Sequence, residues 1–106
     1  MRDRGTQVGV NEALFREVNE RIDDLQGAIG RPETFEIVCE CGDASCVERF
    51  RITAPEYDAL RRDVHRFAVV PGHEVPGIER AVERHASYVV VEKTDPEAAE
   101  AAEKLA

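Results

Sequence analysis

Along residues 11–25, apolar residues recur at steps of three and four, and polar or charged residues fill the positions between them. This pattern predicts an amphipathic helix that begins at Asn11 as its N-cap and ends by Gly27 or Gly30. The apolar stripe of this helix consists of Leu14, Phe15, Val18, Ile22 and Leu25. We expect the stripe to pack on a sheet, with a dimer or partner interface as the alternative. Residues 1–10 show no such period and are expected to form a flexible tail.

From residue 34 onward the apolar period changes to two, which is typical of a half-buried strand. The residues on the apolar side are Phe35, Ile37, Cys39 and Cys41. The same alternation returns at Phe50 and Ile52, after the segment Gly42-Asp43-Ala44-Ser45-Cys46. We therefore predict a β-hairpin whose tip carries the three cysteines of the chain.

The rest of the chain predicts further short elements. Thr53-Ala54-Pro55-Glu56 has the form of a capping box with proline in the first turn, and it predicts a short helix. Residues 66–70 and 88–93 are rich in apolar and β-branched side chains and predict strands. Residues 78–85 fit either a helical stripe or one arm of a hairpin. An acidic, alanine-rich helix is predicted over residues 94–106, and its end is expected to fray.

These elements, spread over 106 residues, indicate one α+β domain. Over residues 11–93 and 94–106 we expect a small antiparallel sheet with an N-terminal amphipathic helix, a short middle helix and a C-terminal helix. The 22 acidic and 14 basic residues leave a formal charge of −8, which opposes binding to nucleic acid. Every apolar run is shorter than the roughly 18 to 20 residues of a membrane helix, so we expect no membrane contact and a cytoplasmic location.

The string Cys39-Glu40-Cys41-Gly42-Asp43-Ala44-Ser45-Cys46 is the strongest chemical signal in the chain. Two cysteines spaced C-x-C in a strand point to the same side, and a turn at Gly42-Asp43 brings Cys46 back toward them. Three thiolates then converge on one point, and zinc commonly takes four nitrogen or sulfur ligands. His73, in the turn Pro71-Gly72-His73-Glu74, is our candidate for the fourth ligand. The remaining candidates are His65, His85, Glu74 and water.

The cysteines also admit explanations without a metal. Cys39 continues the apolar face of the first strand and by itself fits a core position. A disulfide leaves one of the three cysteines unpaired and is disfavoured in the cytoplasm. A redox-reactive thiol group is the main alternative to a metal site. Glu40 and Asp43 are expected to be solvated turn carboxylates, with a role as hydrogen-bond acceptors beside the metal ligands as the alternative.

Several of these motifs together resemble a known group of proteins. The matching strings are Asn11-Glu12, Phe15 to Ile22, Cys39-Glu40-Cys41-Gly42 with Cys46, Glu56-Tyr57, Arg66-Phe67, Pro71-Gly72-His73-Glu74 and Val91-Glu92-Lys93. They look like the signature of small uncharacterised actinobacterial-type proteins with a C-x-C-G-x3-C knuckle and a P-G-H-E turn. The resemblance covers most of residues 11–93. It implies that the cysteines and the turn form one unit, and it implies no reaction.

We therefore expect a small cytoplasmic metal-binding domain with a structural zinc held by Cys39, Cys41, Cys46 and His73. Iron ranks below zinc, although thiolate ligands suit both metals. The CDGSH iron-sulfur group also pairs C-x-C with a third cysteine and a histidine, but its Cys-Asp-Gly-Ser-His string is missing here. The predicted role is that of a binding or regulatory adaptor with a protein partner. A thiol-based redox or metal sensor is the alternative, and an enzyme with water in an open zinc position is the third hypothesis.

Overall fold

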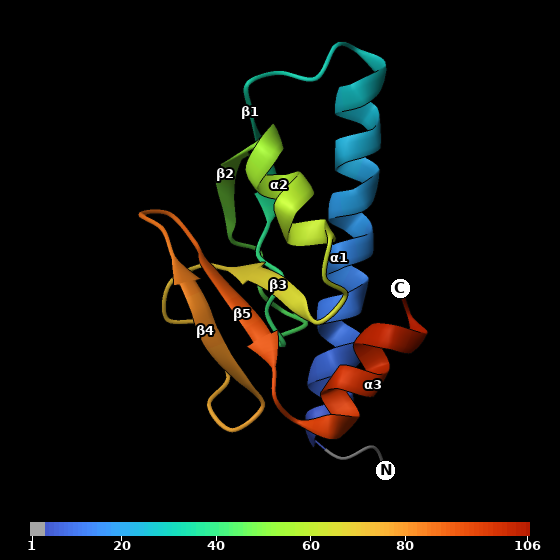
Figure 1. The fold of residues 1–106 in the computed structure, drawn as a ribbon, viewed down its shortest axis with the longest axis vertical. Coiled ribbons are helices and arrows are strands. Elements are labelled where there is room, and N and C mark those ends of the chain that lie inside the picture. Colours follow the sequence, from blue (N-terminus) through green and yellow to red (C-terminus); the bar gives the residue numbers. More distant parts are fainter. Residues whose placement is uncertain (1–3) are drawn as a thin grey trace.

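The structure, a computed structural model, describes residues 4–106, which form three helices and two small antiparallel sheets (Figure 1). The helices are α1 (Arg4–Ala28), α2 (Ala54–Arg61) and α3 (Pro96–Lys104). The strands are β1 (Thr34–Val38), β2 (Arg49–Thr53), β3 (Arg66–Val69), β4 (Glu79–Arg84) and β5 (Val89–Lys93). The predicted α+β class is confirmed. The strands, however, divide into a pair β1-β2 and a triplet in the order β3-β5-β4.

The pair β1-β2 is the predicted hairpin. Phe35 lies opposite Ile52 and Ile37 lies opposite Phe50 in an antiparallel register, so the apolar residues of both strands share one face. That face is buried in the main hydrophobic core, where the ring of Phe35 packs edge-to-face on Tyr57 of α2. The hairpin stem is therefore anchored in the core, and its tip reaches toward the three-stranded sheet.

The three-stranded sheet settles the ambiguity over residues 78–85 in favour of a strand. β4 pairs antiparallel with β5, and the turn between them closes with a hydrogen bond from the His85 amide to the Tyr88 carbonyl. β5 is the central strand of this sheet, and its valines face both hydrophobic layers. Residues 78–85 also show a helical period, but the edge of β5 offers their backbone groups hydrogen-bond partners, with one register shift between Ala81 and Glu83, and strand pairing is favoured.

The predicted starts of α2 and α3 are both present. At α2, the Thr53 hydroxyl accepts from the Glu56 amide and the Glu56 carboxylate accepts from the Thr53 amide, which is a complete capping box. At α3, the Asp95 carboxylate accepts from the amides of Glu97 and Ala98. The body of α3 is held by burial of three small residues, namely Ala98, Ala101 and Ala102.

The prediction of a flexible tail is wrong for residues 4–10, because α1 already begins at Arg4; residues 1–3 lie outside the described part of the chain. These residues are held by close packing against α3. A Cβ atom placed on Gly9 would lie 2.9 Å from both the Ala98 carbonyl oxygen and the Ala101 Cβ. Glycine and alanine therefore let the two helices approach closely, and this contact requires no apolar period in the sequence. Because α1 begins at Arg4, Asn11 lies inside the helix and does not cap it.

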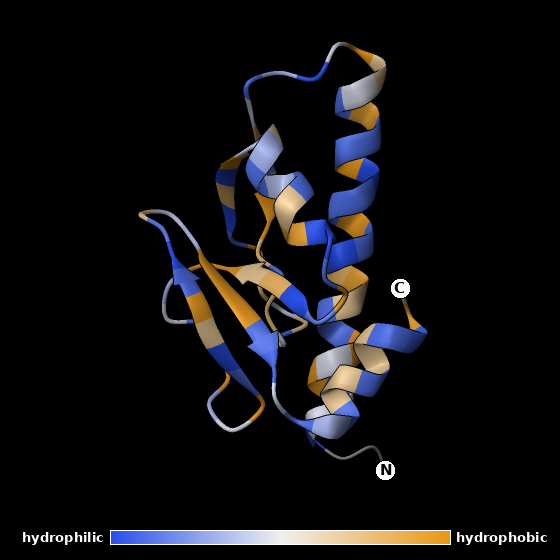
Figure 2. Ribbon diagram, in the orientation of Figure 1, coloured by the Kyte–Doolittle hydropathy of each residue, from blue (hydrophilic) through white to orange (hydrophobic). Residues whose placement is uncertain are grey.

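The expectation that the apolar stripe of α1 packs on a sheet is also wrong in its main part. Glu12, Arg16 and Asn19 point into the protein, whereas three members of the stripe are exposed: Leu14, Val18 and Leu25. Hydrophobic and hydrophilic segments alternate along α1, which stands at one edge of the molecule (Figure 2). None of the described helices combines the length and the apolar character that a membrane crossing requires.

A cluster of three buried charged side chains joins α1 to the three-stranded sheet. The Lys93 ammonium lies 2.5 Å from Oε1 of Glu12, contacts Glu79, and sits 4.9 Å from the centre of the Phe67 ring. Burial, reinforced by the hydrogen bond with Glu79, raises the pKa of Glu12 well above its ordinary value. The higher pKa favours the protonated, neutral form of Glu12 beside the ammonium of Lys93 and the carboxylate of Glu79.

Candidate metal centre

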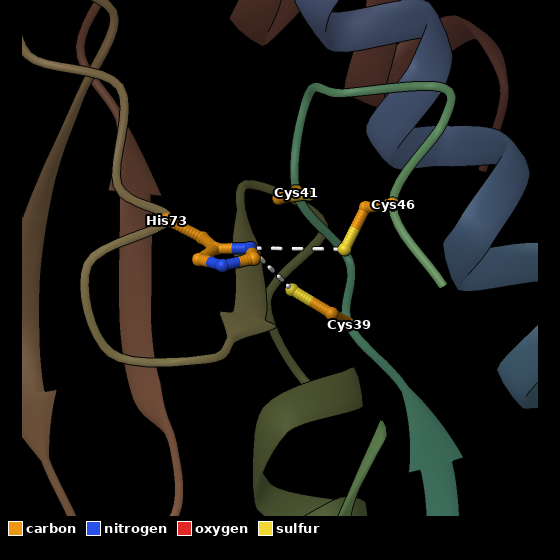
Figure 3. Close-up of side chains that lie close together, drawn as sticks. All are labelled: Cys39, Cys41, Cys46 and His73. Carbon is orange, nitrogen blue, oxygen red and sulfur yellow. Dashed lines mark hydrogen bonds between the residues drawn. The ribbon is translucent and has the colours of Figure 1, made fainter. Parts of the chain in front are cut away.

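The structure brings Cys39, Cys41, Cys46 and His73 together, as the sequence predicts. Each offers one ligand atom, and the four atoms all lie within 4.8 Å of one another. Cys39 and Cys41 follow the end of β1, Cys46 lies in the hairpin tip, and His73 lies in the turn after β3. Figure 3 shows the side chains of Cys39 and Cys46 directed at the imidazole ring of His73. Two segments that are distant in the sequence thus meet at one point.

The spacing of the donor atoms fits a tetrahedral metal ion. His73 Nδ1 lies 3.6 Å from Cys39 Sγ and 3.7 Å from Cys46 Sγ. A tetrahedral zinc with its usual bond lengths to sulfur and nitrogen separates an S and an N ligand by roughly 3.5 Å. In the absence of an ion, the same distances fit weak hydrogen bonds between a thiol and the imidazole nitrogen. The separations of His73 Nδ1 from Cys39 Sγ and Cys46 Sγ are therefore compatible with a shared metal ion.

The hairpin tip is shaped by a short local turn and by contact with α1. The Cys46 amide donates to the Asp43 carbonyl, and the Asp43 carboxylate accepts from the amide and hydroxyl of Ser45. The side-chain amide of Asn11 donates to the Gly42 carbonyl at 2.8 Å. A Cβ atom on Gly42 would lie 2.5 Å from a methyl carbon of Val8, so glycine is required for this approach. α1 therefore contacts the loop that carries the three cysteines, which we call the cysteine loop, and fixes its position.

His73 is oriented by its turn and by a carboxylate. The His73 amide donates to the Val70 carbonyl, and Gly72 adopts a φ of 94° that only glycine takes readily. The other ring nitrogen, Nε2, lies 2.7 Å from the carboxylate of Glu48. A proton on Nε2 leaves Nδ1 as the lone pair that faces the sulfurs. Glu48 therefore selects the ring tautomer that a metal needs.

Glu40, which lies between two ligands, is fully buried, so the prediction of a solvated turn carboxylate is wrong for it. The Glu40 carboxylate accepts hydrogen bonds from Asn19 Nδ2, from Arg61 Nη2 and from the Ala68 amide. The Glu40 amide also donates to the Ala68 carbonyl. This residue fixes the backbone that carries Cys39 and Cys41 to α1, α2 and β3 at once. Asp43 is exposed, as expected of a turn residue.

The environment of the thiols disfavours free thiolates. Burial raises the pKa of both Cys39 and Cys41. The Val70 amide donates to Cys39 Sγ at 3.2 Å, which partly offsets the effect of burial on that thiol. A bound metal ion would supply the positive charge that thiolates lack here and would release the thiol protons. Without that charge, these two cysteines are poor nucleophiles.

The other candidate ligands lie elsewhere. His65 Nε2 is 2.7 Å from the Glu103 carboxylate, at the end of α3. The ring of His85 stacks on Tyr88 and its Nε2 contacts Glu83. The Glu74 carboxylate accepts from the Gly72 amide within its own turn. All three have other partners in the described structure, and none belongs to the cysteine group.

Sequence reasoning missed Glu48 and Arg61, which position ligands without being ligands. One signal pointed to Glu48. The hairpin register, extended by one pair beyond the strands, places Glu48 opposite Cys39, and the Cys39 amide donates to the Glu48 carbonyl at 2.9 Å. No comparable signal points to Arg61. Its guanidinium reaches Glu40 from α2, and only the tertiary fold brings these two residues together.

Comparisons with known proteins leave this geometry as the basis for assigning a function. No protein-family model matches the chain, and neither a curated protein nor a solved structure does so. The resemblance to small actinobacterial-type proteins therefore stays a prediction. The assignment of a function therefore rests on the four converging side chains and on the residues that hold them in place.

Proposed function

We propose that Cys39, Cys41, Cys46 and His73 hold a structural zinc ion. The observation that carries this proposal is the separation of 3.6 to 3.7 Å between the His73 nitrogen and two of the sulfurs. Three sulfurs and one imidazole nitrogen are a common donor set for structural zinc. The ion would fasten the cysteine loop to the turn after β3. The energy of metal binding would then contribute directly to folding.

A structural role fits the donor set better than a catalytic one. Catalytic zinc keeps one position for water or substrate, whereas four protein side chains fill a tetrahedron. Cys39 and Cys41 are almost fully buried, and the carboxylates nearest the ligands are engaged in holding them. We choose zinc over iron because three thiolates and one imidazole form one of the standard tetrahedral donor sets of structural zinc, although thiolates suit both metals.

The biological role that we propose for this zinc-stabilised domain is that of a cytoplasmic binding or regulatory adaptor. The buried parts of the metal centre are used for positioning, which leaves the outer surface of the domain to contact other proteins. The exposed apolar residues of α1 support this role, because an apolar helical surface on a small folded domain commonly serves an interaction.

A thiol-based sensor is the second candidate, and one observation favours it. Cys46 is only partly buried, unlike the other two cysteines. A hollow of about 260 Å³ lies beside the site and is lined in part by Cys41, Asp43, His73 and Glu74. A peroxide that entered there would be attacked by the Cys41 thiolate, which would become a sulfenic acid while the second peroxide oxygen left as hydroxide, and the bond from Cys41 to the ion would weaken. The sensor hypothesis requires a fold that survives loss of the ion.

Metal content and thiol reactivity of anaerobically purified protein separate the two roles. A structural site predicts one zinc per chain and three thiols that react only as the fold melts. Replacing Cys41 by Ser should then unfold the protein, while Ala44→Ser, at an exposed position of the same loop, should leave both zinc content and fold unchanged. A Cys41→Ser protein that stays folded would favour the sensor. Absence of metal, with thiols that react in the folded state, would contradict the zinc proposal.

A further inference from the structure

The hollow beside the proposed metal centre lies between the two segments that the ion would join. One wall is formed by residues 41–43 of the cysteine loop, and the other is formed by residues 72–75 of the turn after β3. Figure 3 shows the turn that carries His73 facing the cysteine loop across the four side chains. Two of the proposed ligands, Cys41 and His73, thus line the hollow. A solute inside the hollow therefore contacts the junction that the ion would hold.

The hollow has an acidic mouth. Asp43 and Glu74 both line it, and its described lining contains neither lysine nor arginine. Each carboxylate is held by its own turn, since Asp43 accepts from the amide and hydroxyl of Ser45 and Glu74 accepts from the Gly72 amide. These donors are neutral groups, so the hydrogen bonds orient the carboxylates without cancelling their charge. A divalent cation near the mouth is attracted by it, whereas an anion is repelled.

We propose that the zinc-loaded protein exchanges its metal with free cations through this hollow, and that Asp43 and Glu74 keep anionic chelators out of it. An incoming divalent ion would reach Cys41 and His73 first, and zinc would leave as that ion took over the thiolates. One divalent ion replaces another in this step, so no proton or electron is transferred. This inference rests on the structural zinc proposed above and specifies the class of solute with which that zinc exchanges.

The sign of the charge at the mouth separates two groups of competing solutes. Small chelators that bind zinc through carboxylates are anions at neutral pH, because their carboxyl groups are ionised. They would have to pass two fixed carboxylates to reach the ion, and a free divalent cation meets no such barrier. Zinc in this site would therefore respond to the concentration of free metal ions and resist removal by anionic ligands.

The test uses the full-length, zinc-loaded protein and three probes that differ in charge. Cadmium ion is the cationic probe, phenanthroline is the neutral chelator, and EDTA is the anionic chelator. Each probe is mixed with the protein at low ionic strength, and samples are passed rapidly through a gel-filtration column. Elemental analysis of the protein fraction then gives the rate of zinc loss to each probe.

Two double variants remove the same charge from different places. D43N/E74Q neutralises the mouth, and the new amide oxygens can accept the hydrogen bonds that the carboxylates accept. The control is D24N/E33Q, because both of its positions are exposed. Asp24 also lies about 20 Å along α1 from Asn11, which contacts the cysteine loop. That separation exceeds the distance over which salt screens surface charges.

We expect D43N/E74Q to slow the loss of zinc to cadmium about fivefold and to speed the loss to EDTA by a similar factor. The loss to phenanthroline should stay unchanged, because a neutral chelator experiences no net attraction or repulsion at the mouth. Added salt should diminish both effects, and D24N/E33Q should match the native chain with every probe. A variant that merely weakened the site would instead lose zinc faster to all three probes, which would overturn the proposal.

Two further results would overturn the proposed route. Equal rates for D43N/E74Q and the native chain would assign the exchange to another face, such as the one at the partly buried Cys46. Rates that are the same for all three probes in the native chain would mean that zinc leaves before any probe arrives. Either result, obtained with a zinc-loaded protein, contradicts only the exchange route. A protein that holds no zinc contradicts the zinc site itself.

Discussion

Arg61 Nη2 donates a 2.6 Å hydrogen bond to Oε1 of Glu40, the residue between Cys39 and Cys41. The contact joins α2 to the backbone of the candidate metal centre. It also places an ion pair in the interior, because Glu40 is fully buried and the Arg61 side chain is only 15% exposed. Buried pairs of this kind set the geometry around them and are costly to break from one side.

Replacing Arg61 alone should therefore lower the free energy of unfolding more than replacing Arg61 and Glu40 together. We expect Arg61→Met to lower the free energy of unfolding by about 3 to 5 kcal/mol, because the buried Glu40 side chain loses its cationic partner. The double variant E40Q/R61M should recover part of this loss. Urea unfolding of the zinc-loaded proteins measures both effects. A loss below about 1 kcal/mol for Arg61→Met would show that the ion pair is not needed to hold this loop.

Glu48 is expected to affect metal affinity more than folding. The Glu48 carboxylate lies 2.7 Å from His73 Nε2 and is about half exposed, so its removal disturbs the ring and little else. We predict that Glu48→Gln weakens zinc binding by about 10- to 100-fold, as measured by competition with a chelator. Glu36→Gln, on the stem of the same hairpin, serves as the control and should leave the affinity unchanged. Equal affinities for the two variants would remove Glu48 from the site.

Glu12 should give the protein a distinct pH dependence. Its ordinary pKa is 4.5, and burial raises this pKa well above that value in the fold. Above pH 4.5 the folded protein retains a proton that the unfolded chain has lost, so this contribution to stability falls as the pH rises through the folded pKa. Gln at position 12 stays neutral and removes the contribution. The free energy of unfolding of Glu12→Gln, relative to that of the native chain, should therefore increase from about pH 5 to pH 8.

The exposed Glu17 on the same helix supplies the control for this experiment. Its side chain is 59% exposed and pairs with Arg21, away from the buried cluster. The pH profile of Glu17→Gln should run parallel to that of the native protein. A parallel profile for Glu12→Gln as well would mean that Glu12 is ionised in the fold.

Two glycines of α1 allow a matched test of helix packing. Alanine is the better helix former by about 1 kcal/mol, so both replacements gain the same intrinsic preference. At Gly9 the new methyl group would meet the backbone of Ala98, at 2.9 Å from its carbonyl oxygen, whereas nothing lies within 4 Å at Gly27. We expect Gly9→Ala to destabilise the protein by about 1 to 3 kcal/mol. Gly27→Ala should stabilise it by up to about 1 kcal/mol, and equal shifts in melting temperature would contradict the close α1-α3 contact.

The elements that the sequence predicts well are those whose determinants are local. The hairpin follows from a period of two, and α2 follows from the capping box at Thr53 and Glu56. The four site residues were identified from chemistry, because three cysteines around a turn and a histidine held between glycine and proline turns are unusual outside metal sites. The structure places them together, and the identity of a bound ion belongs to the proposal.

What the sequence could not predict depends on partners that are distant along the chain. The beginning of α1 has no apolar period because Gly9 packs through its lack of a side chain. The inward face of α1 is polar because Asn19 pairs with the backbone of Val38 and Glu12 pairs with Lys93. A periodicity rule assumes that the buried face of a helix is apolar, so in α1 it selected the wrong face.

The proposed ligands come from two distant parts of the chain, with Cys46 and His73 separated by β2, α2 and β3. Under the proposed structural role, a chain without an ion would leave this junction open. Such a chain would unfold more often, and the unfolded form is the one that cellular proteases degrade. Under the proposed structural role, the amount of this protein in a cell would follow the supply of zinc through its lifetime alone, without a dedicated regulator of its synthesis.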